Sequence, residues 1–413
     1  MIDIKQIRNN SAAIEDSIKR RGLSVNVDAL LALDERRRAL IAELDGVQAK
    51  RNALASEVGK GKPSASQVEN GRKLKEQQQK LEEDFRLIDD EYSVIIAEVP
   101  NFIAEGTPDG GEESNLEIER WGDIKADGPI KDHLQISELY NLYDFEAGAK
   151  VAGNKFYFMR HKAVKLWQAI LLATQEIVEE AGFELVSVPH MVNKEIAMGT
   201  GYLPKGEEEQ NYVDEAQGLV MIATSEIPLT GMHKDDVLNL DNAKMYAGIS
   251  PCYRLEAGAY GKFSKGLYRT HQFEKLEMYV FCKPYESAAY LKRILEVEKS
   301  ICEKFKIPYR VMRIAAGDLS TPAYEKYDLE YYSPAEKEYR ELTSCSNCTD
   351  YQARNLNIRY RTENGKLDYL HTLNGTAVVS SRMPIAILEN HQDKAGKVVL
   401  PDAIAKYYGS SEL

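Results

Sequence analysis

The chain has 413 residues, of which 29% are charged and 43% hydrophobic, and its net charge is −12. It is long enough for roughly two or three domains and is too acidic to bind nucleic acid over its whole surface, although a local basic patch suffices for RNA. No apolar run approaches the roughly 18 residues of a membrane span, and the first residues lack the apolar segment of a signal peptide. We therefore expect a cytoplasmic protein with no membrane association.

Cysteine and histidine usage favours reduced, structural thiols over a metal or disulfide framework. An odd, sparse set of five cysteines does not suggest a disulfide framework. Cys345 and Cys348 form a C-x2-C pair, but no second such pair or nearby histidine pair completes a zinc site. The seven histidines contain no H-E-x-x-H pattern, so a metalloprotease is not indicated.

The first hundred residues predict a helical hairpin. Residues 3–21 have the pattern of a short amphipathic helix that ends at Gly22. From about Asp28, apolar residues recur at alternating steps of three and four; the repeat breaks at residues 59–66, resumes, and ends at Pro100. Two heptad runs around a short turn predict an antiparallel two-helix coiled coil, about 45 Å long at 1.5 Å per residue. Three positions of the repeat are polar: Arg37, Arg51 and Gln78.

Basic side chains gather in the distal half of this hairpin, whereas acidic ones crowd the base of its second helix. A basic tip on an acidic protein suits a phosphate backbone. The alternative is a solvated coiled-coil surface that serves as a dimer or partner contact. The basic residues are Lys50, Arg51, Lys60, Lys62, Arg72, Lys73, Lys75 and Lys80.

Residues 101–123 are rich in Gly, Glu and Asn and are expected to form a linker. From about His133 onward, helical and strand patterns alternate. The predicted elements are helices at 162–181 and 284–306 and strands at 183–192, 310–314 and 327–332.

The most informative stretch is a predicted hairpin from Tyr253 to Phe281, two strands joined by a loop rich in glycine and basic residues. Glycines let backbone approach a ligand closely, and basic side chains attract phosphate. Glu274, Leu276, Met278 and Val280 form the more apolar face of the return strand, which we expect to face the core, while the other face carries Phe273, Lys275, Glu277, Tyr279 and Phe281. Such a hairpin suits a nucleotide plus a small polar ligand; the alternative is an ordinary charged hairpin in a surface sheet.

This hairpin resembles motif two of the class II aminoacyl-tRNA synthetases, in the version carried by seryl-tRNA synthetases. Residues 183–192, with Pro189, are similar to motif one, and residues 373–392, with Arg382, are similar to motif three. The helical hairpin resembles the arm with which that family grips tRNA. The matching motif-two residues are Tyr253, Arg254, Glu256, Ala257, Gly258, His271, Gln272, Phe273 and Glu277.

The resemblance implies an α+β fold, in which an antiparallel two-helix coiled-coil arm precedes a class II synthetase domain built on a mostly antiparallel sheet flanked by helices. It places an N-terminal tRNA-binding domain at residues 1–103, with its helical-hairpin arm at about 28–99, and a catalytic domain at residues 104–413. It also implies a homodimer.

The implied function is that of a serine--tRNA ligase. Such an enzyme activates L-serine with ATP to seryl-adenylate and transfers the seryl group to the 3'-terminal adenosine of tRNA(Ser), with tRNA(Sec) as a further candidate acceptor. One alternative is a serine ligase acting on a carrier protein, which would have little use for the basic arm. A second is a non-catalytic RNA-binding relative, against which the presence of Arg254, Glu341 and Arg382 argues.

Family roles carry over to matching positions. Arg254, Glu277 and Arg382 are the implied catalytic residues; Arg254 would clamp the α-phosphate and Arg382 the γ-phosphate. Glu341 and Ser344 would hold Mg²⁺. The implied serine pocket consists of Thr224, Ser225, Glu226, Glu277 and Thr376. The implied ATP site consists of Arg254, Leu255, Glu256, Thr270, Phe273, Glu341, Leu342, Thr343, Ser344 and Arg382. Residues 377–381 depart from the commoner motif-three sequence, with polar Ser380 and Ser381.

Overall fold

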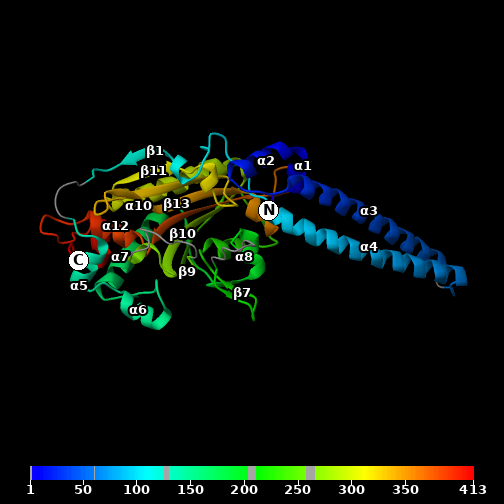
Figure 1. The fold of residues 1–413 in the computed structure, drawn as a ribbon, viewed down its shortest axis with the longest axis horizontal. Helices are drawn as coiled ribbons and strands as arrows, with labels where there is room; N and C mark the ends of the chain where they lie inside the picture. The colour runs from blue at the N-terminus through cyan, green and yellow to red at the C-terminus, as the bar shows by residue number, and fades with distance from the viewer. Residues whose placement is uncertain (1, 60, 125–129, 203–210, 257–265) are drawn as a thin grey trace. The chain divides into compact units, whose positions relative to one another are not determined.

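The computed structural model describes the chain except residues 1, 60, 125–129, 203–210 and 257–265 (Figure 1). It divides into two compact units, Met1–Pro100 and Asn101–Leu413. No helix within the described ranges is long and apolar enough to cross a membrane.

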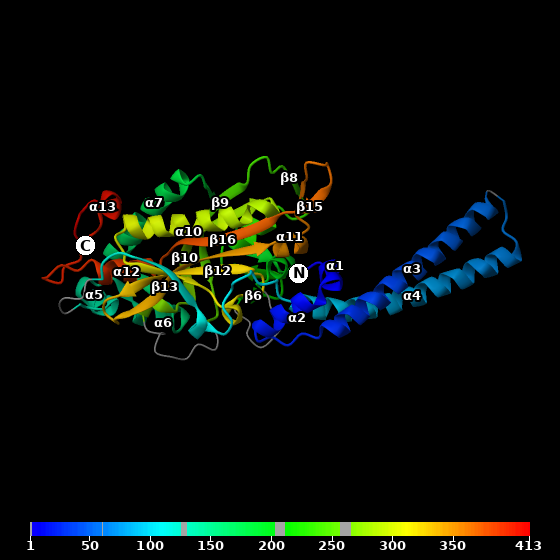
Figure 2. The same cartoon turned by 90° about the horizontal axis from the view of Figure 1, so that it is seen from above.

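The first unit is entirely helical. Two long antiparallel helices lie side by side (Figure 2), which confirms the predicted helical hairpin. The prediction of one helix over residues 3–21 is wrong, because Asn10 has a φ of −151° and its side chain accepts a hydrogen bond from the Ala13 amide, so it caps a second helix. The helices are α1 (Ile4–Asn9), α2 (Ser11–Arg20), α3 (Val27–Val58) and α4 (Ala65–Glu98).

Side-chain caps begin both long helices. The Asn26 side chain accepts from the Ala29 amide at 2.9 Å at the start of α3. Ser64 and Gln67 form a reciprocal capping box at the start of α4. Each cap satisfies backbone amides that have no partner within the helix and so fixes the residue at which that helix begins.

The polar positions of the heptad repeat find partners across the seam. The Arg37 guanidinium contacts the Asp89 carboxylate and lies 5.1 Å from the centroid of the Tyr92 ring. Arg51 donates to the Gln78 side chain. Because a polar residue in such a seam is satisfied only opposite its partner, these pairs select one register of the two helices.

The second unit is built on an eight-stranded sheet. All neighbouring strands are antiparallel except β4 and β9, which are parallel. This arrangement, together with the helical first unit, confirms the predicted fold class. In spatial order the strands are β1 (Leu116–Trp121), β11 (Tyr309–Arg313), β12 (Glu325–Ser333), β13 (Glu338–Thr349), β16 (His371–Val379), β10 (Gln272–Cys282), β9 (Lys244–Tyr253) and β4 (Glu184–Ser187).

Shorter elements surround this sheet. The helices are α5 (His133–Tyr140), α6 (Phe145–Ala152), α7 (Lys162–Glu180), α8 (Lys194–Thr200), α9 (Glu226–Gly231), α10 (Ser287–Lys304), α11 (Tyr351–Asn355), α12 (Met383–Asn390) and α13 (Asp402–Tyr408). The 3-10 helices are η1 (Glu112–Ser114), η2 (Gly266–Tyr268), η3 (Pro284–Glu286) and η4 (Ala316–Asp318). The small sheets consist of β2 (Tyr143–Asp144) with β3 (Phe158–Met159), of β5 (Met191–Asn193), β7 (Leu219–Met221) and β6 (Val213–Asp214), and of β15 (Leu367–Tyr369), β14 (Arg359–Arg361) and β8 (Val237–Leu238).

One face of the large sheet packs against α7 and α10 to form the main core. Leu276, Met278 and Val280 of β10 point into it, as predicted. Tyr279 and Phe281 on the opposite face belong to a second core. That second core covers the far part of β10 and leaves its start, from Phe273 to Glu277, to line a cavity.

Residues 101–123 are not the predicted linker. Asn101 is buried, and its side-chain amide donates to the carbonyl oxygens of Pro322 and Cys348 at 2.9 and 3.0 Å. Further along, β1 pairs with β11 at the edge of the large sheet. β1 is an edge strand held to β11 by backbone hydrogen bonds, and its apolar residues Leu116, Ile118 and Trp121 are exposed, so composition alone did not reveal it.

We predict that Asn101→Ala lowers the free energy of unfolding of the second unit by about 1–3 kcal/mol, because two buried carbonyls lose a donor. The measurement is urea denaturation followed by tryptophan fluorescence, which reports this unit because both tryptophans, Trp121 and Trp167, lie in it. The exposed Asn364→Ala serves as the matched control. Equal midpoints for the two variants would contradict a role of Asn101 in anchoring this segment.

Candidate active site

A cavity of about 560 Å³ opens where β10, β12, β13 and β16 meet. It collects side chains from segments that are far apart in the sequence. The predicted site residues that line it are Glu226, Arg254, Glu256, Thr270, Phe273, Glu277, Glu341, Leu342, Thr343, Ser344, Thr376 and Arg382. Three others do not line it: Leu255, Thr224 and Ser225.

Thr224 and Ser225 are buried in the framework beside the cavity. The Ser225 hydroxyl donates to the Gly248 carbonyl of β9 at 3.1 Å, and the Thr224 hydroxyl accepts from the Glu226 amide at 3.3 Å. These contacts place the start of α9, and with it Glu226. Ala257 and Gly258 of the motif-two match lie outside the described residues.

A bulge in β13 sets which side chains face the cavity. Thr343 pairs with Leu329 of β12, but the next residue of β12, Glu330, pairs with Glu341, so Leu342 is the extra residue. In a regular strand, residues three positions apart point to opposite faces. The bulge removes this opposition, and Glu341 and Ser344 both line the cavity.

A second bulge does the same in β16. Leu276 of β10 pairs with Val378, and Glu277 pairs with Thr376, so Ala377 is the extra residue. Thr376 and Val379 consequently both line the cavity. The Thr376 hydroxyl lies directly across from Glu277 and donates to its carboxylate at 3.3 Å.

Several cations line the cavity. The Arg382 guanidinium lies 3.0 Å from the Glu341 carboxylate, and that of Arg254 lies 5.3 Å from the centroid of the Phe273 ring. Burial alone would raise the pKa of Glu341, but Arg382 and Lys326 outweigh it and lower this pKa to about 2. Glu341 is therefore ionised at neutral pH.

Lys326 is a site residue that the sequence analysis missed. It lines the cavity from β12, and its ammonium lies 2.9 Å from Asp328, the residue paired with Ser344. Burial raises the pKa of Asp328 to about 7, against the opposing effect of Lys326. The signal in the sequence was slight, since Lys326 directly precedes a predicted strand.

Two buried carboxyl groups, those of Glu226 and Glu277, also line the cavity. Glu277 contacts the ammonium group of Lys275, two residues earlier on the same face of β10. Glu226 accepts hydrogen bonds from Tyr202 at 2.8 Å and Asn374 at 3.1 Å. Burial, and then the charge of Glu277, raise the pKa of Glu226. A ligand with a positive charge would relieve the repulsion between these carboxylates.

Four residues that contact these carboxyl groups were absent from the sequence-predicted set: Tyr202, Lys275, Gln352 and Asn374. Lys275 was recognisable in principle, because it alternates with Phe273 and Glu277. Gln352 gave no signal, since it follows β13 on a short helix and does not line the cavity.

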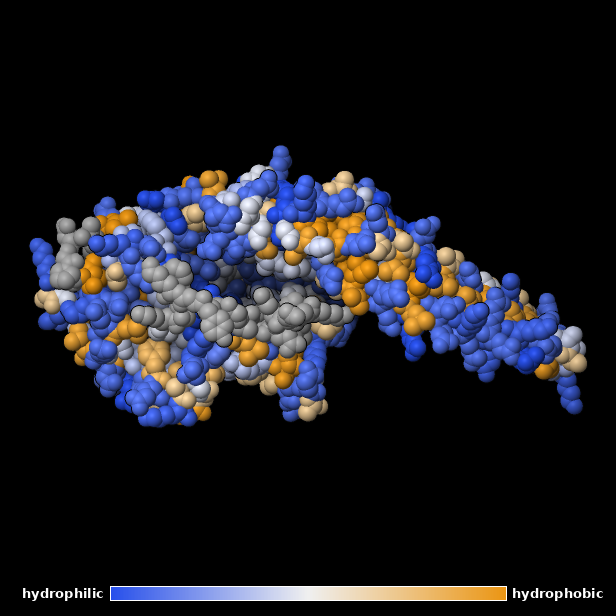
Figure 3. Space-filling model, in the orientation of Figure 1, coloured by the Kyte–Doolittle hydropathy of each residue, from blue (hydrophilic) through white to orange (hydrophobic). Residues whose placement is uncertain are grey.

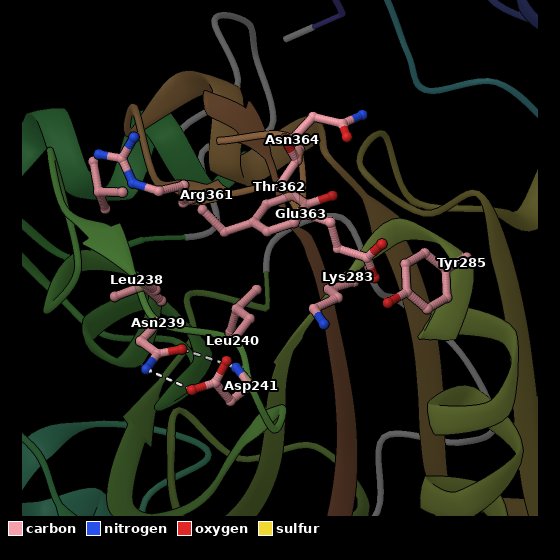
Figure 4. A pocket seen from close by; sticks show the side chains of 12 residues that line it. Leu238, Asn239, Leu240, Asp241, Lys283, Tyr285, Arg361, Thr362, Glu363 and Asn364 are labelled. Carbon is pink, nitrogen blue, oxygen red and sulfur yellow. Dashed lines mark hydrogen bonds between the residues drawn. The ribbon is translucent and has the colours of Figure 1, made fainter. Parts of the chain in front are cut away.

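A second cavity, of about 780 Å³, lies elsewhere in the same unit (Figure 4). Its walls come from residues 237–241 and 360–364 together with Lys283 and Tyr285. Asn239 and Asp241 hydrogen-bond to each other in it. No residue of the predicted site lines this larger cavity, so the predicted chemistry belongs to the first one.

Two family models match the chain. The tRNA synthetase class II core domain (G, H, P, S and T) matches residues 209–391, and the seryl-tRNA synthetase N-terminal domain matches residues 1–103. The fold, the cavity and the first of these matches define a class II aminoacyl-tRNA synthetase.

Relatives that match over their full length identify the family within this class of synthetases. Serine--tRNA ligase of Dictyoglomus turgidum is 42% identical, and the match covers 100% of this chain and 99% of the relative. That of Rubrobacter xylanophilus is 41% identical over 99% of this chain and 98% of the relative. The crystal structure of seryl-tRNA synthetase from Pyrococcus horikoshii complexed with ATP superposes with a TM-score of 0.90 at 34% identity and covers 100% of this chain and 99% of that one. The chain belongs to the seryl-tRNA synthetase family, as its motifs predicted.

We predict that Glu341→Gln destabilises the second unit at pH 5 by about 0.5–1 kcal/mol, a value reduced for the partial exposure of the ion pair with Arg382. The folded pKa of Glu341 is depressed, so its stabilising effect is present above the unfolded value of about 4.3 and is lost as the pH falls toward about 2. Urea unfolding at pH 5 and pH 3 should show the gap to the unsubstituted protein closing in acid. Exposed Glu363→Gln is the control; a gap independent of pH would contradict this assignment.

Proposed function

We propose that this chain is a serine--tRNA ligase that activates L-serine with ATP to seryl-adenylate and then transfers the seryl group to the 3'-terminal adenosine of tRNA(Ser). The observation that carries the proposal is one cavity that is lined both by cations and by two buried carboxyl groups. Arg254, Arg382 and Lys326 suit the phosphates of ATP, and Glu226 and Glu277 suit the ammonium group of an amino acid.

In the first step, a serine carboxylate oxygen attacks the α-phosphorus of ATP. The new O–P bond forms as the bond from the α-phosphorus to the bridging oxygen breaks, and pyrophosphate leaves with that electron pair. Arg254 would stabilise the charge on the α-phosphate, Arg382 would hold the γ-phosphate, and Phe273 would stack on adenine. No enzyme nucleophile is needed, and positioning can supply roughly 7–11 kcal/mol of the barrier reduction.

In the second step, the hydroxyl group of the terminal adenosine attacks the carbonyl carbon of seryl-adenylate. The new ester bond forms as the bond between the carbonyl carbon and the phosphate oxygen breaks; AMP leaves with that electron pair, and the proton of the attacking hydroxyl group passes to the departing phosphate or to water. The same cavity serves both steps. The seryl group remains hydrogen-bonded to Glu277, Thr376 and Glu226 while its bond to AMP is replaced by the bond to tRNA.

Selectivity for serine is proposed to lie at the buried carboxyl groups. The Glu277 carboxylate already accepts from the Thr376 hydroxyl, so it is placed to bond a substrate hydroxyl or ammonium. Alanine has no hydroxyl to add to the contacts that Glu277 makes with Thr376 and Lys275, so it would lose the hydrogen bond that serine gains. Threonine also carries a hydroxyl group, so the pocket can reject it only by leaving no room for its additional methyl group.

Glu341 and Ser344 suit Mg²⁺, because both offer hard oxygen ligands and the bulge at Leu342 puts them on one face. Within the described ranges, no cluster of three His, Cys, Asp or Glu side chains could hold a metal ion alone. This fits a cation whose remaining ligands are substrate phosphates and water. When bound, Mg²⁺ would be held by Glu341 and Ser344 and would neutralise phosphate charge, while Arg382 would orient the polyphosphate.

Residues 1–103 are proposed as the tRNA-binding domain and residues 104–413 as the catalytic domain. On the arm, Lys50, Lys62, Lys75 and Lys80 are exposed, on a surface that is largely hydrophilic in its distal part (Figure 3). Three predicted contacts are engaged within the arm: Arg72 and Lys73 pair with Glu69, and Arg51 contacts Gln78. Lys60 lies outside the described residues.

The proposal extends to a homodimer, to tRNA(Sec) as a second acceptor, and to a cytoplasmic location. The family resemblance supports the homodimer. Charging of purified tRNA(Sec) compared with tRNA(Ser) tests the second acceptor, and sedimentation of the purified chain tests the dimer.

Pyrophosphate exchange into ATP, with each amino acid in turn and no tRNA, tests the first step. We predict exchange with serine, and a loss of roughly 10²-fold or more in kcat/KM for serine in Glu277→Ala, because truncating one member of a buried charge pair costs about 2–5 kcal/mol. Glu274→Ala, on the opposite face of β10, is the matched control and should retain activity. Serine activation retained in the Glu277 variant would rule out its role; exchange with another amino acid would refute the substrate.

Aminoacylation tests the arm. We predict that Lys75→Glu combined with Lys80→Glu raises the KM for tRNA(Ser) by about tenfold or more and leaves pyrophosphate exchange unchanged, because each lost phosphate contact weakens binding and lowers the salt dependence of log K by about 1. Lys366→Glu with Lys394→Glu places the same charge change on exposed positions of the second unit. Equal KM values for the two double variants would argue for the partner-contact interpretation of the arm.

A further inference from the structure

The carboxyl group of Glu226 is held from behind by one buried side-chain amide. Gln352, on α11 beside β16 (Figure 2), is fully buried and donates to the Glu226 carboxylate at 2.6 Å. We propose that Gln352 is a positioning residue for the amino-acid pocket, which fixes the orientation and the charged state of Glu226 for a substrate ammonium group. This inference rests on the proposed function.

All four hydrogen-bonding positions of the Gln352 amide are used. Its nitrogen donates to Glu226 and to the carbonyl oxygen of Thr200, at 2.6 and 3.2 Å. Its oxygen accepts from the hydroxyl groups of Tyr279 at 2.8 Å and Thr372 at 2.7 Å. A flipped amide would set its oxygen against a carboxylate oxygen and a carbonyl oxygen, so the neighbours determine its orientation.

The contacts close into a ring that returns to Glu226. Gln352 accepts from the Tyr279 hydroxyl, which lies 2.6 Å from the Thr230 hydroxyl. Thr230 in turn lies 2.7 Å from the backbone carbonyl of Glu226. Because Tyr279 donates its hydrogen to Gln352, the single hydroxyl hydrogen of Thr230 is shared between Tyr279 and the Glu226 carbonyl. The firm tie to Glu226 is therefore the bond from Gln352 to its carboxylate.

Of the four ring members, only Glu226 lines the cavity. The other three members, Gln352, Tyr279 and Thr230, are fully buried behind Glu226. They therefore cannot contact a substrate in the cavity. Tyr202 and Asn374 hold Glu226 from the cavity side. The arrangement separates a substrate-facing layer from a supporting layer, and Gln352 links the two.

Charge explains why the support must be an N–H donor. Burial and Glu277 disfavour a charged Glu226, whereas donors from Gln352 and Tyr202 favour it. A neutral Glu226 would lose its attraction for an ammonium group. The titratable groups that interact with Glu226 are Tyr202, Lys275, Glu277, Tyr279 and Cys348.

The experiment is pyrophosphate exchange with serine across pH 6–9 on the full chain, for Gln352→Glu and for Gln352→Met. Gln352→Glu replaces the donors with oxygens, and Gln352→Met removes the polar group at similar volume. We expect the KM for serine to rise about tenfold or more in both variants, with the KM for ATP within twofold of the unsubstituted enzyme. The acid limb of the pH profile for serine should move to higher pH, because Glu226 protonates more readily.

Thr372→Val is the matched control. It removes a hydrogen bond to the same amide but leaves the bond from Gln352 to Glu226 in place, so the KM for serine should stay within about twofold of the unsubstituted value. If one Gln352 variant fails to fold, the other carries the test. An unchanged KM for serine in a folded variant, an equal rise in both KM values, or an unmoved pH profile would overturn the inference. Absence of serine exchange in the unsubstituted enzyme would instead refute the proposed function.

Discussion

Two single-residue bulges determine what the cavity of the second unit contains. Strand pairing alternates side chains between faces, so a shift of one residue reverses every side chain beyond it. At Leu342 this reversal brings Glu341 to the face of Ser344, and at Ala377 it brings Thr376 to the face of Val379. In regular strands, one member of each pair would enter the core behind the sheet. The site therefore depends on backbone hydrogen-bond geometry as much as on side-chain identity.

The charges that the bulges gather are paired with each other before any substrate arrives. Arg382 faces Glu341, and Lys275 faces Glu277. Burying charges is costly unless they are paired, so these pairs let a polar cavity persist between two apolar cores. Under the proposed function, the cations would bind the phosphates of ATP, and Glu226 and Glu277 would bind the ammonium group of the amino acid.

Sequence patterns predicted elements whose signal is periodic or belongs to a motif. The heptad repeat located α3 and α4 closely, and it showed that Arg37, Arg51 and Gln78 interrupt the seam, but it did not show that Arg51 meets Gln78. The break at Asn10 depends on one backbone conformation inside a continuous amphipathic pattern. β1 escaped prediction because an edge strand is recognised by its partner β11, almost two hundred residues later in the chain.

The same distinction applies to the site. Residues that belong to motifs, such as Arg254 and Arg382, were found because their neighbours in sequence identify them. Gln352 was not, because it acts on Glu226, 126 positions away, through a contact that exists only after β13, β16 and α9 have assembled. Side chains that line the cavity as part of a motif can be predicted from local sequence, whereas a buried side chain that contacts them from another element is defined only by three-dimensional packing.

The site also draws its precision from the core on the far side of the sheet. Glu277 stands on the same strand as Leu276 and Met278, which pack against α7 and α10. Because the core is packed at nearly crystalline density, a strand that carries both kinds of residue cannot shift on one face without disturbing the other. Reaction by positioning alone requires placement within a fraction of an ångström, and central strands provide it better than loops. The eight-stranded sheet therefore keeps the site rigid, and the two bulges orient side chains toward the cavity without disrupting the sheet.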